Sequence, residues 1–325
     1  MTPPELHLVV PGPLDQLTGG YVYDARMVSG LREFGWRVHV HNLSGRFPEP
    51  DASARRAMNA TLESLPDGSR VLIDGLAMGG LPAPIEAHGG RLRILALVHH
   101  PLAEETGLSE EERRSFMDRE CRALKPCAGV IVSSDFSARG LDAYGVPASR
   151  VRAVLPGTEP APSAEGPAPG ESPVLLCVAS VTPRKGHDVL IAALERVRDL
   201  PWTCVCVGSL DRDREHADSV LRQASAADLA DRIDFVDELD ADATGGLYHG
   251  ASLFVLASHY EGYGMALAEA LARGLPVVST TGGAIPFTVP ADAGILVEPG
   301  DAAGFGDVLR ALLGPNMTTR TACPD

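Results

Sequence analysis

The sequence lacks long apolar runs, is poor in aromatic residues and contains very little lysine. No apolar run reaches the roughly 18 residues that a membrane-spanning helix needs. The first residues, MTPPELHLVVPGP, lack the basic region that precedes the apolar part of a secretory signal. A basic amphipathic helix that would bind anionic lipid is also missing. We therefore expect a cytoplasmic protein without stable membrane insertion.

Positively charged side chains are outnumbered by negative ones, mainly in the second half of the chain. The chain has 28 Lys and Arg against 43 Asp and Glu, a net charge of −15. Residues 1–156 hold 17 basic and 19 acidic side chains (net −2), so residues 157–325 hold 11 and 24 (net −13). Nucleic-acid backbones require clustered positive charge, which excludes nucleic acid as a partner. A phosphate ligand must be held locally, by a few cations and backbone amides.

Metal-ligand patterns are absent as well. The six cysteines show no zinc spacing with partner histidines, and Cys204-Val205-Cys206 is not a CxxC motif, so we expect reduced and mostly buried thiols. Asp211-Arg212-Asp213 resembles a DxD metal motif, but it lies in a predicted loop within a run of charges. We predict no metal site. The cysteines are residues 121, 127, 177, 204, 206 and 323.

Short apolar runs alternate with helix-periodic segments along the whole chain. The predicted strands are 6–10, 38–43, 71–74, 94–99, 129–133, 151–155, 174–180, 203–208, 233–236, 253–257, 276–279 and 295–297. The predicted helices are 21–34, 52–65, 109–124, 136–144, 189–199, 214–228, 241–249, 265–272 and 303–313. Strands that alternate with helices predict α/β domains whose parallel sheets are covered on both faces.

A segment rich in proline divides the chain. Residues 157–173, GTEPAPSAEGPAPGESP, have five prolines and no large apolar residue, which indicates a linker. We expect an N-terminal acceptor domain at 1–156, a nucleotide-sugar domain at 174–313 and a tail at 314–325. Ligands of open α/β sheets lie beyond the carboxyl ends of the strands. The prediction is two Rossmann-like, doubly wound domains facing an interdomain cleft.

The first motif is the stretch 258–270, SHYEGYGMALAEA. A strand ends near Ala257, a glycine-containing loop follows, and a helix starts near Met265. Such a corner offers backbone N–H groups and a helix N-terminus to an anion. Glu261 in the loop and Glu269 in the helix can then accept hydrogen bonds from hydroxyls at two ends of one ligand. The alternative is two solvated glutamates, which the apolar neighbours of Glu269 disfavour.

The second motif is the stretch 178–188, VASVTPRKGHD, which also runs from a strand end to a helix start. Lys125 and Lys185 are the only lysines of the chain. Lysine suits a diphosphate oxygen, and Arg184 beside Lys185 can bind a second oxygen. The alternative is a solvent-facing basic pair in a turn.

Two histidines stand at the carboxyl end of the predicted strand 94–99. His99 and His100 are expected to point toward the ligand region, with ordinary capping or packing as the alternative. Glu104 and Glu105 nearby could contact an acceptor hydroxyl, although a solvated pair is the preferred interpretation.

Together the two motifs resemble the donor-binding signatures of the retaining family-4 glycosyltransferases of the GT-B fold (glycosyl transferases group 1). The resemblance implies that Glu261 holds donor-sugar hydroxyls, Glu269 the nucleotide ribose, Lys185 the diphosphate, and His99 the sugar near its reacting carbon. It also implies catalytic and donor-binding sets. The catalytic candidates are His99, Arg184, Lys185 and Glu261. The donor-binding candidates are Gly19, Gly20, Ser180, Asp237, Glu238, Leu239, Gly262, Tyr263, Gly264, Met265 and Glu269.

The chain departs from the family pattern in two places. The family usually places an arginine where this chain has Ser180, and Arg184 is the candidate replacement. The chain also stops soon after Leu313, without the long final helix that commonly crosses back to the N-terminal domain. Looser domain closure is one interpretation of this departure, and truncation is the other.

The resulting prediction is a metal-independent, retaining glycosyltransferase. It moves a sugar from a nucleoside diphosphate sugar, a co-substrate rather than a cofactor, to a hydroxyl of a small soluble acceptor. Frequent use of Arg, Ala, Gly and Pro is typical of a GC-rich bacterial genome, which points to a specialised metabolite as the acceptor. A sugar phosphorylase or nucleotide-sugar epimerase of the same fold is the alternative. A sugar-nucleotide sensor is another, and a nucleotide-dependent dehydrogenase is disfavoured because no GxGxxG opens a helix after the first strand. The oligomeric state is open.

Overall fold

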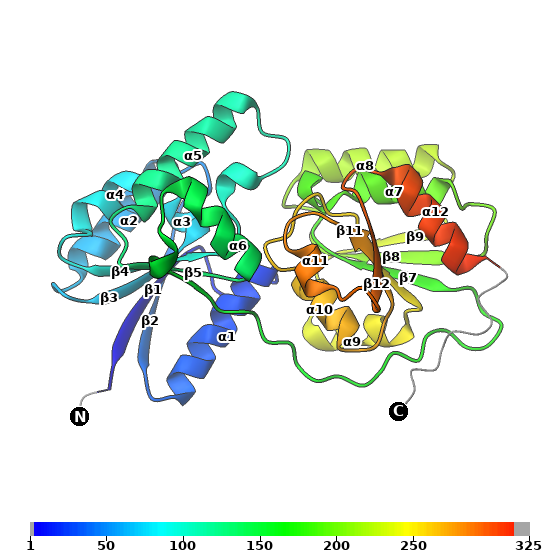
Figure 1. The fold of residues 1–325 in the computed structure, drawn as a ribbon, viewed down its shortest axis with the longest axis horizontal. Coiled ribbons are helices and arrows are strands. Elements are labelled where there is room, and N and C mark those ends of the chain that lie inside the picture. The colour runs from blue at the N-terminus through cyan, green and yellow to red at the C-terminus, as the bar shows by residue number, and fades with distance from the viewer. Residues whose placement is uncertain (1–2, 315–325) are drawn as a thin grey trace. The chain divides into compact units, whose positions relative to one another are not determined.

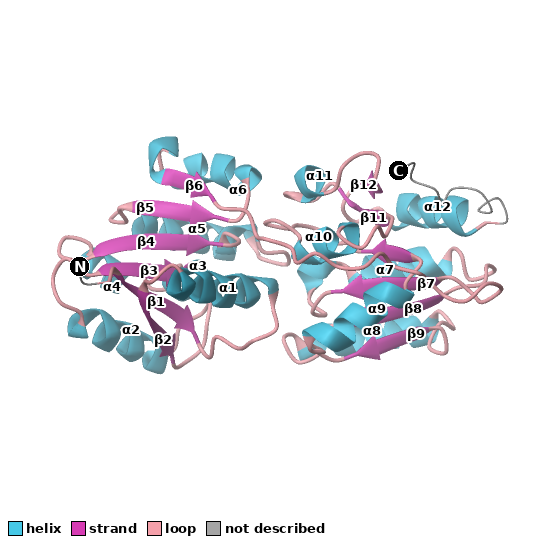
Figure 2. Cartoon of the chain, turned by 90° about the horizontal axis from the view of Figure 1, so that it is seen from below, coloured by secondary structure: helices cyan, strands magenta, loops and turns pink. Residues whose placement is uncertain are grey.

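The computed structural model describes residues 3–314, and the chain divides into two compact units between Pro156 and Gly157. Each unit contains one six-stranded sheet with every pairing parallel. Figure 1 shows helices on both faces of each sheet, and Figure 2 shows the arrows of each sheet running in one direction. Among the described residues, no helix is both long and apolar enough to cross a membrane.

The N-terminal domain has strand order β2-β1-β3-β4-β5-β6. Its strands are β1 Glu5–Pro11, β2 Arg37–Leu43, β3 Arg70–Asp74, β4 Arg93–Val98, β5 Gly129–Val132 and β6 Val151–Ala153. Its α-helices are α1 Gly19–Glu33, α2 Ala52–Ser64, α3 Gly75–Met78, α4 Pro82–His88, α5 Glu110–Leu124 and α6 Asp135–Gly140. Helices α2, α4 and α5 lie on one face of the sheet and α1 on the other (Figure 1). Both faces of the central strands are therefore buried, which explains their nearly continuous apolar sequence.

The C-terminal domain has strand order β12-β11-β10-β7-β8-β9. Its strands are β7 Val174–Val178, β8 Thr203–Val207, β9 Ile233–Val236, β10 Leu253–Val255, β11 Val277–Thr280 and β12 Gly294–Val297. Its α-helices are α7 His187–Glu195, α8 Arg214–Ala226, α9 Ala241–Gly250, α10 Met265–Leu271, α11 Ile285–Thr288 and α12 Ala302–Leu313. Helices α7, α8 and α12 cover one face, and α9 and α10 cover the other (Figure 1).

The strand orders fix where a ligand is expected in each domain. In an open parallel sheet, the crevice lies beyond the carboxyl ends of the two strands where the order reverses. In the N-terminal domain the order reverses between β1 and β3, and in the C-terminal domain between β7 and β10. The motif around Lys185 follows β7, and the motif around Glu261 follows β10. Both motifs therefore lie at the reversal point of one sheet.

The proline-rich segment 157–173 contains no helix or strand, and it packs onto the C-terminal domain. The amide of Ala164 donates to the carbonyl of Arg273 at 2.8 Å, and the amides of Glu165 and Gly166 donate to that of His249. Ala164 also packs against the apolar core of this domain. Part of the predicted linker is thus a structural element of the domain that follows it.

The structure differs from the predicted elements mainly in short helices and strand ends. Helices α3, α4 and α11 were not predicted, because they span four to seven residues and are rich in glycine or proline. The two prolines of α4 occupy its first turn, where proline removes no intrahelical hydrogen bond. β4 ends at Val98, so His99 lies just beyond the strand and not within it. The predicted tail beyond Gly314, including Cys323, lies outside the described residues.

A buried carboxylate fixes the chain that follows β4. Glu120 of α5 is 6% exposed and accepts hydrogen bonds from the amides of Leu102 (2.7 Å) and Ala103 (3.1 Å). Burial raises the pKa of Glu120 to about 7, although the two amides act in the opposite direction. The two carboxylate oxygens of Glu120 therefore accept from the free amides at the start of the short 3-10 helix Leu102–Glu104.

We expect Glu120→Gln to lower the free energy of unfolding by roughly 1–3 kcal/mol at pH 8, because the amide group offers one acceptor for two buried N–H donors. Urea denaturation measures this, with Glu111→Gln on the exposed side of the same helix as the control, expected within about 0.5 kcal/mol of wild type. Equal stability of the two variants would contradict the role of Glu120.

Candidate functional site

The candidate site is formed by two loops at the reversal point of the C-terminal sheet. One loop, residues 179–186, leads from β7 to α7, and the other, residues 256–264, leads from β10 to α10. The amide of His259 donates to the carbonyl of Arg184 at 2.8 Å, so the loops are hydrogen-bonded to each other. The two motifs found separately in the sequence are one structural unit.

Gly186 allows the close approach of the two loops. It adopts a left-handed conformation (φ 64°), and a Cβ built on it would lie 2.1 Å from the carbonyl oxygen of Ala257. Glycine meets both the conformational and the steric requirement. The glycine after Lys185 is therefore explained by contact between loops.

Lys185 and Glu261 form a buried ion pair at the centre of the site. Lys185 Nζ lies 2.6 Å from Glu261 Oε1, which also accepts a hydrogen bond from Ser258 Oγ at 2.7 Å. Arg184 Nη1 lies 3.7 Å from Glu261 Oε2 and donates to the carbonyl of Tyr260 at 2.9 Å. The Glu261 side chain is 8% exposed, and those of Lys185 and Arg184 are 19% exposed.

The charges of these side chains set their protonation. Burial would raise the pKa of Glu261, but Lys185 and Arg184 outweigh it and hold that pKa below its ordinary value. Burial, helped by Arg184, lowers the pKa of Lys185, while Glu261 opposes the change. With one carboxylate and two cations, the group carries a net charge of +1. In a strongly acidic domain, this local surplus is suited to an anionic ligand.

A third loop, after β11, fixes the backbone of Glu261. The carbonyl of Glu261 accepts a hydrogen bond from the amide of Ala284 at 2.8 Å, and Glu261 forms an isolated parallel bridge with Gly283. A Cβ on Gly283 (φ 63°) would lie 2.4 Å from the Glu261 carbonyl oxygen. The Gly282-Gly283 turn therefore positions Glu261.

Glu269 lies in α10 and has a partner that the sequence did not reveal. Tyr248 of α9 donates from its hydroxyl to Glu269 Oε2 at 3.2 Å and lies within 3.1 Å of the Ala266 carbonyl oxygen. Tyr248 is 1% exposed, and Arg273 lies 4.7 Å above its ring. Glu269 is half-buried and held in place, so a freely solvated glutamate is not what the structure contains.

The other predicted donor-binding residues of this domain lie at the same edge of the sheet. The carbonyl of Ser180 accepts from the amide of Thr182, and Glu238 forms an ion pair with Arg212 at 3.6 Å. Gly264 precedes α10 as its N-cap residue, in a left-handed conformation (φ 92°), and the carbonyl of Tyr263 accepts from Thr288 Oγ1. The remaining members are Asp237, Leu239 and Gly262, which occupy the loops after β9 and β10, and Met265, the first residue of α10.

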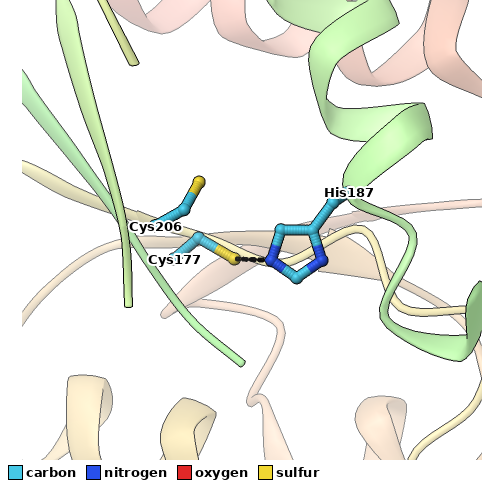
Figure 3. A group of neighbouring side chains, drawn as sticks. All are labelled: Cys177, His187 and Cys206. Carbon is cyan, nitrogen blue, oxygen red and sulfur yellow. Dashed lines mark hydrogen bonds between the residues drawn. The ribbon is translucent and has the colours of Figure 1, made fainter. Parts of the chain in front are cut away.

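A group of thiols and an imidazole lies beside the Lys185 loop (Figure 3). Cys177 of β7, Cys206 of β8 and His187, the first residue of α7, are buried, with Cys177 Sγ 3.7 Å from His187 Nε2. Their potential ligand atoms lie within 4.8 Å of one another, a spacing that a metal ion could bridge. Hydrogen bonding with Cys206 and burial raise the pKa of the Cys177 thiol, which favours the protonated, non-ligating form. The absence of a metal stays a prediction.

The cysteines and the DxD motif otherwise have structural explanations. All five described cysteines are free thiols, four of them buried, as predicted. Asp213 Oδ1 accepts from the amide of His216 and caps α8, and Asp211 forms an ion pair with Arg214. The two aspartates of the DxD motif thus serve the start of a helix.

The predicted residues of the N-terminal domain gather at the carboxyl edge of their own sheet. Gly19 and Gly20 begin α1, and a Cβ on Gly20 would lie 3.2 Å from His99 Cδ2. His99 Nε2 contacts two aspartates that the sequence analysis did not single out, Asp24 at 2.9 Å and Asp74 at 3.6 Å. His100 Nε2 lies 3.5 Å from Glu105, so Glu105 has a partner.

Comparison with known protein families gives a match to the C-terminal domain. Residues 172–314 match the family model described as glycosyl transferases group 1. A D-inositol 3-phosphate glycosyltransferase of Acidothermus cellulolyticus is 30% identical over 245 residues, covering 70% of this chain and 54% of that protein. A GDP-mannose-dependent alpha-(1-6)-phosphatidylinositol monomannoside mannosyltransferase of Mycolicibacterium smegmatis is 27% identical over 275 residues, covering 78% and 69%. The chain spans about half the length of the first such relatives.

Solved structures show the fold. Sucrose-phosphate synthase from Thermosynechococcus elongatus matches with a TM-score of 0.81 at 21% identity, over 96% of this chain and 90% of that one. Anabaena HepE in complex with UDP-glucose matches with a TM-score of 0.69 at 16% identity, over 95% and 90%. The predicted GT-B fold of two Rossmann-like domains is confirmed.

We expect Lys185→Met to lower the free energy of unfolding by about 3 kcal/mol at pH 7, because Glu261 would stay buried without its closest cation. The pKa of Glu261 is lowered in the folded protein, so its contribution is present above the unfolded pKa of about 4.5 and is lost as pH falls through the folded pKa. The loss caused by the substitution should therefore shrink below pH 4.5.

Urea denaturation of Lys185→Met, Glu261→Gln and the double variant measures this coupling, with exposed Lys125→Met as the control. The double variant should lose less than the sum of the single losses. Additive losses would contradict a direct interaction between the two side chains.

Proposed function

We propose that this chain, whose residues 172–314 are a glycosyl transferases group 1 domain, moves a sugar from a nucleoside diphosphate sugar to an acceptor hydroxyl. The observation that carries the proposal is the buried Lys185–Glu261 pair with Arg184, at the carboxyl ends of β7 and β10. It combines a surplus positive charge with a fixed carboxylate in the place where open α/β sheets bind ligands.

The cations of the site have the chemistry to stabilise a leaving diphosphate. Transfer breaks the bond between the anomeric carbon and the diphosphate oxygen, and negative charge develops on that oxygen. Lys185 supplies a compact ammonium and Arg184 a planar guanidinium, each partly shielded from water, where charge stabilisation is strong. We assign both to the diphosphate, with no metal ion in the proposed reaction.

The carboxylates have the chemistry to bind hydroxyls. Glu261, held by Lys185 and Ser258, is ionised and can accept hydrogen bonds from the donor sugar. Glu269, oriented by Tyr248, is assigned to the ribose, and the main chain of residues 237–239 to the base. Backbone amides of residues 262–265 would contact sugar or phosphate.

We further propose retention at the anomeric carbon by a front-face reaction. In it the departing diphosphate oxygen takes the proton of the acceptor hydroxyl as the new glycosidic bond forms on the same face. This mechanism needs no covalent nucleophile. His99 is assigned to orient the sugar, and its place relative to the C-terminal loops stays a prediction.

The acceptor is proposed to be a small soluble hydroxyl compound. Of the two relatives described above, one is named for D-inositol 3-phosphate, and the other is named for phosphatidylinositol monomannoside and for its dependence on GDP-mannose. Inositol phosphates and GDP-mannose are therefore the first compounds to test. A sugar phosphorylase remains the second candidate, since the same cations would bind inorganic phosphate.

A thermal-shift panel of UDP-, GDP-, TDP- and ADP-sugars tests the donor. A donor at 100 times its Kd stabilises the protein by about 2.7 kcal/mol, a clear rise in the midpoint temperature. Inorganic phosphate with a disaccharide, which would be cleaved by a phosphorylase, is the comparison. Stabilisation by none of the nucleotide sugars would contradict the proposed function.

Lys185→Ala should lower kcat/KM with the donor identified in this way by more than about 100-fold, or about 3 kcal/mol of transition-state stabilisation. Lys125→Ala is the matched control, because Lys125 is the other lysine of the chain and is exposed in the N-terminal domain. Turnover by Lys185→Ala close to that of the control would exclude a role in leaving-group stabilisation.

A further inference from the structure

Three ionisable side chains meet at the carboxyl edge of the N-terminal sheet, and two of them have no part in the function proposed above. We call Asp24, Asp74 and His99 the aspartate–histidine group. His99 Nε2 lies 2.9 Å from Asp24 Oδ1 and 3.6 Å from Asp74 Oδ2. Their potential ligand atoms all lie within 4.8 Å of one another. Such a convergence of two acids and one base requires an explanation.

The three side chains come from separate elements around one point of the sheet. Asp24 lies in the second turn of α1, which follows β1; Asp74 is the last residue of β3; His99 follows β4. The strand order reverses between β1 and β3, so the group lies at the place where this sheet is expected to bind a ligand.

The two aspartates are buried, and their oxygens have different partners. Asp24 is 1% exposed and Asp74 6% exposed. Asp74 Oδ1 caps α3 by accepting from the amides of Leu76 (2.8 Å) and Ala77 (3.3 Å), which leaves Oδ2 on the side of His99. A buried carboxylate is costly unless a cation compensates it. A protonated His99 compensates both carboxylates at once.

The imidazole ring has a fixed orientation. Its Cδ2 atom lies against Gly20, where a Cβ would come within 3.2 Å, and Tyr23 packs edge-on at a centroid distance of 5.1 Å. Nε2 faces the aspartates, and within residues 3–314 no hydrogen-bond partner is found for Nδ1. Because the side chain remains 20% exposed, Nδ1 is the nitrogen that can meet a ligand.

The protonation of the group follows from these contacts. Burial lowers the pKa of His99, but the hydrogen bond that His99 donates to Asp24 and the charges of Asp24 and Asp74 outweigh burial and raise it. Burial and the charge of Asp24 raise the pKa of Asp74 to about 7, against the effect of His99. Tyr23 is the other titratable side chain on α1 beside the ring. Its burial, and to a smaller extent the negative charge of Asp24, raise the pKa of its hydroxyl.

We propose that Asp24 and Asp74 are positioning residues that hold His99 as an imidazolium, with Nε2–H donated to Asp24 and Nδ1–H directed to an oxygen of the substrate. This inference rests on the proposed function for the identity of that substrate. It assigns His99 the role of a charged hydrogen-bond donor, and it excludes a general base, because an imidazolium has no lone pair to accept a proton.

The protonation of His99 determines the direction in which activity changes with pH. A histidine whose pKa is raised in the folded protein is protonated below that pKa and loses its charge as pH rises through it. The Nδ1–H donor is then lost, because the remaining proton stays on Nε2 beside Asp24. Activity that needs this donor falls on the alkaline side, and a general base at this position would make activity fall on the acidic side.

The protonation state is measured without substrate by long-range ¹H–¹⁵N NMR of the histidine rings in the full chain, with His99→Gln identifying the signals. We expect the His99 pKa above 6.5, with neutral rings protonated on Nε2. In Asp24→Asn it should fall toward or below 6.5, and in Asp74→Asn it should fall less, because the distance to Nε2 is longer. Tyr23→Phe keeps the ring contact and the carboxylates, so it should leave the His99 pKa unchanged.

Activity provides the second measurement. In Asp24→Asn the alkaline limb of kcat/KM should move to lower pH in parallel with the NMR pKa, and Asp24→Glu should restore part of the shift. A wild-type His99 pKa below 6.5, an unchanged pKa in Asp24→Asn, or an acidic limb that follows His99 would overturn the proposal. Broadening of the His99 signals by stoichiometric Mn²⁺ would also overturn it, because the group would then hold a cation in place of a proton.

The two proposals fail in different ways. If no nucleotide sugar binds but His99 titrates as expected, the proposed function is wrong and the aspartate–histidine group stands. If nucleotide sugars are turned over while His99 titrates as an ordinary histidine, the group is wrong and the proposed function stands.

Discussion

The candidate site depends on one buried ion pair, between Lys185 and Glu261, across 76 residues of sequence. Burying either charge without its partner would cost several kcal/mol of desolvation free energy, so each side chain is buried only because the other compensates its charge. The pair also joins the loops after β7 and β10, whose backbones are hydrogen-bonded and in contact through Gly186. The third loop, through Gly283 and Ala284, holds the backbone of Glu261. The ion pair and the glycine contacts thus both hold the loops of the site in the same arrangement.

Both domains place ionisable side chains at the reversal point of their sheet, but the balance of charge differs between the two. Each sheet gathers polar groups beyond the strands at its reversal point. In the C-terminal domain two cations surround one carboxylate, and in the N-terminal domain two carboxylates surround one histidine. The first arrangement carries a net positive charge that can bind an anion. The second retains a proton on an imidazole that would otherwise lose it near neutral pH.

The sequence predicted the twelve strands and the long helices because strands buried on both faces appear as continuous apolar runs. It missed α3, α4 and α11, whose short, glycine- or proline-containing sequences carry no helical periodicity. Sequence motifs identified Lys185 and Glu261 as site residues, but assigned them to different parts of the ligand. Their ion pair could not be predicted, because no local pattern reveals a contact between distant loops. Asp24, Asp74 and Tyr248 were missed for the same reason: single polar residues at strand ends or on helices become informative only through their partners.

The proline-rich segment between the domains has a further consequence. Its hydrogen bonds to Arg273 and His249 begin at Ala164, so the part of the connection before this point is short and contains Pro160 and Pro162. Six residues of extended, proline-containing chain, 158–163, reach only roughly 20 Å, at about 3.1 Å per residue. Such a spacer keeps each domain at a high effective concentration with respect to the other.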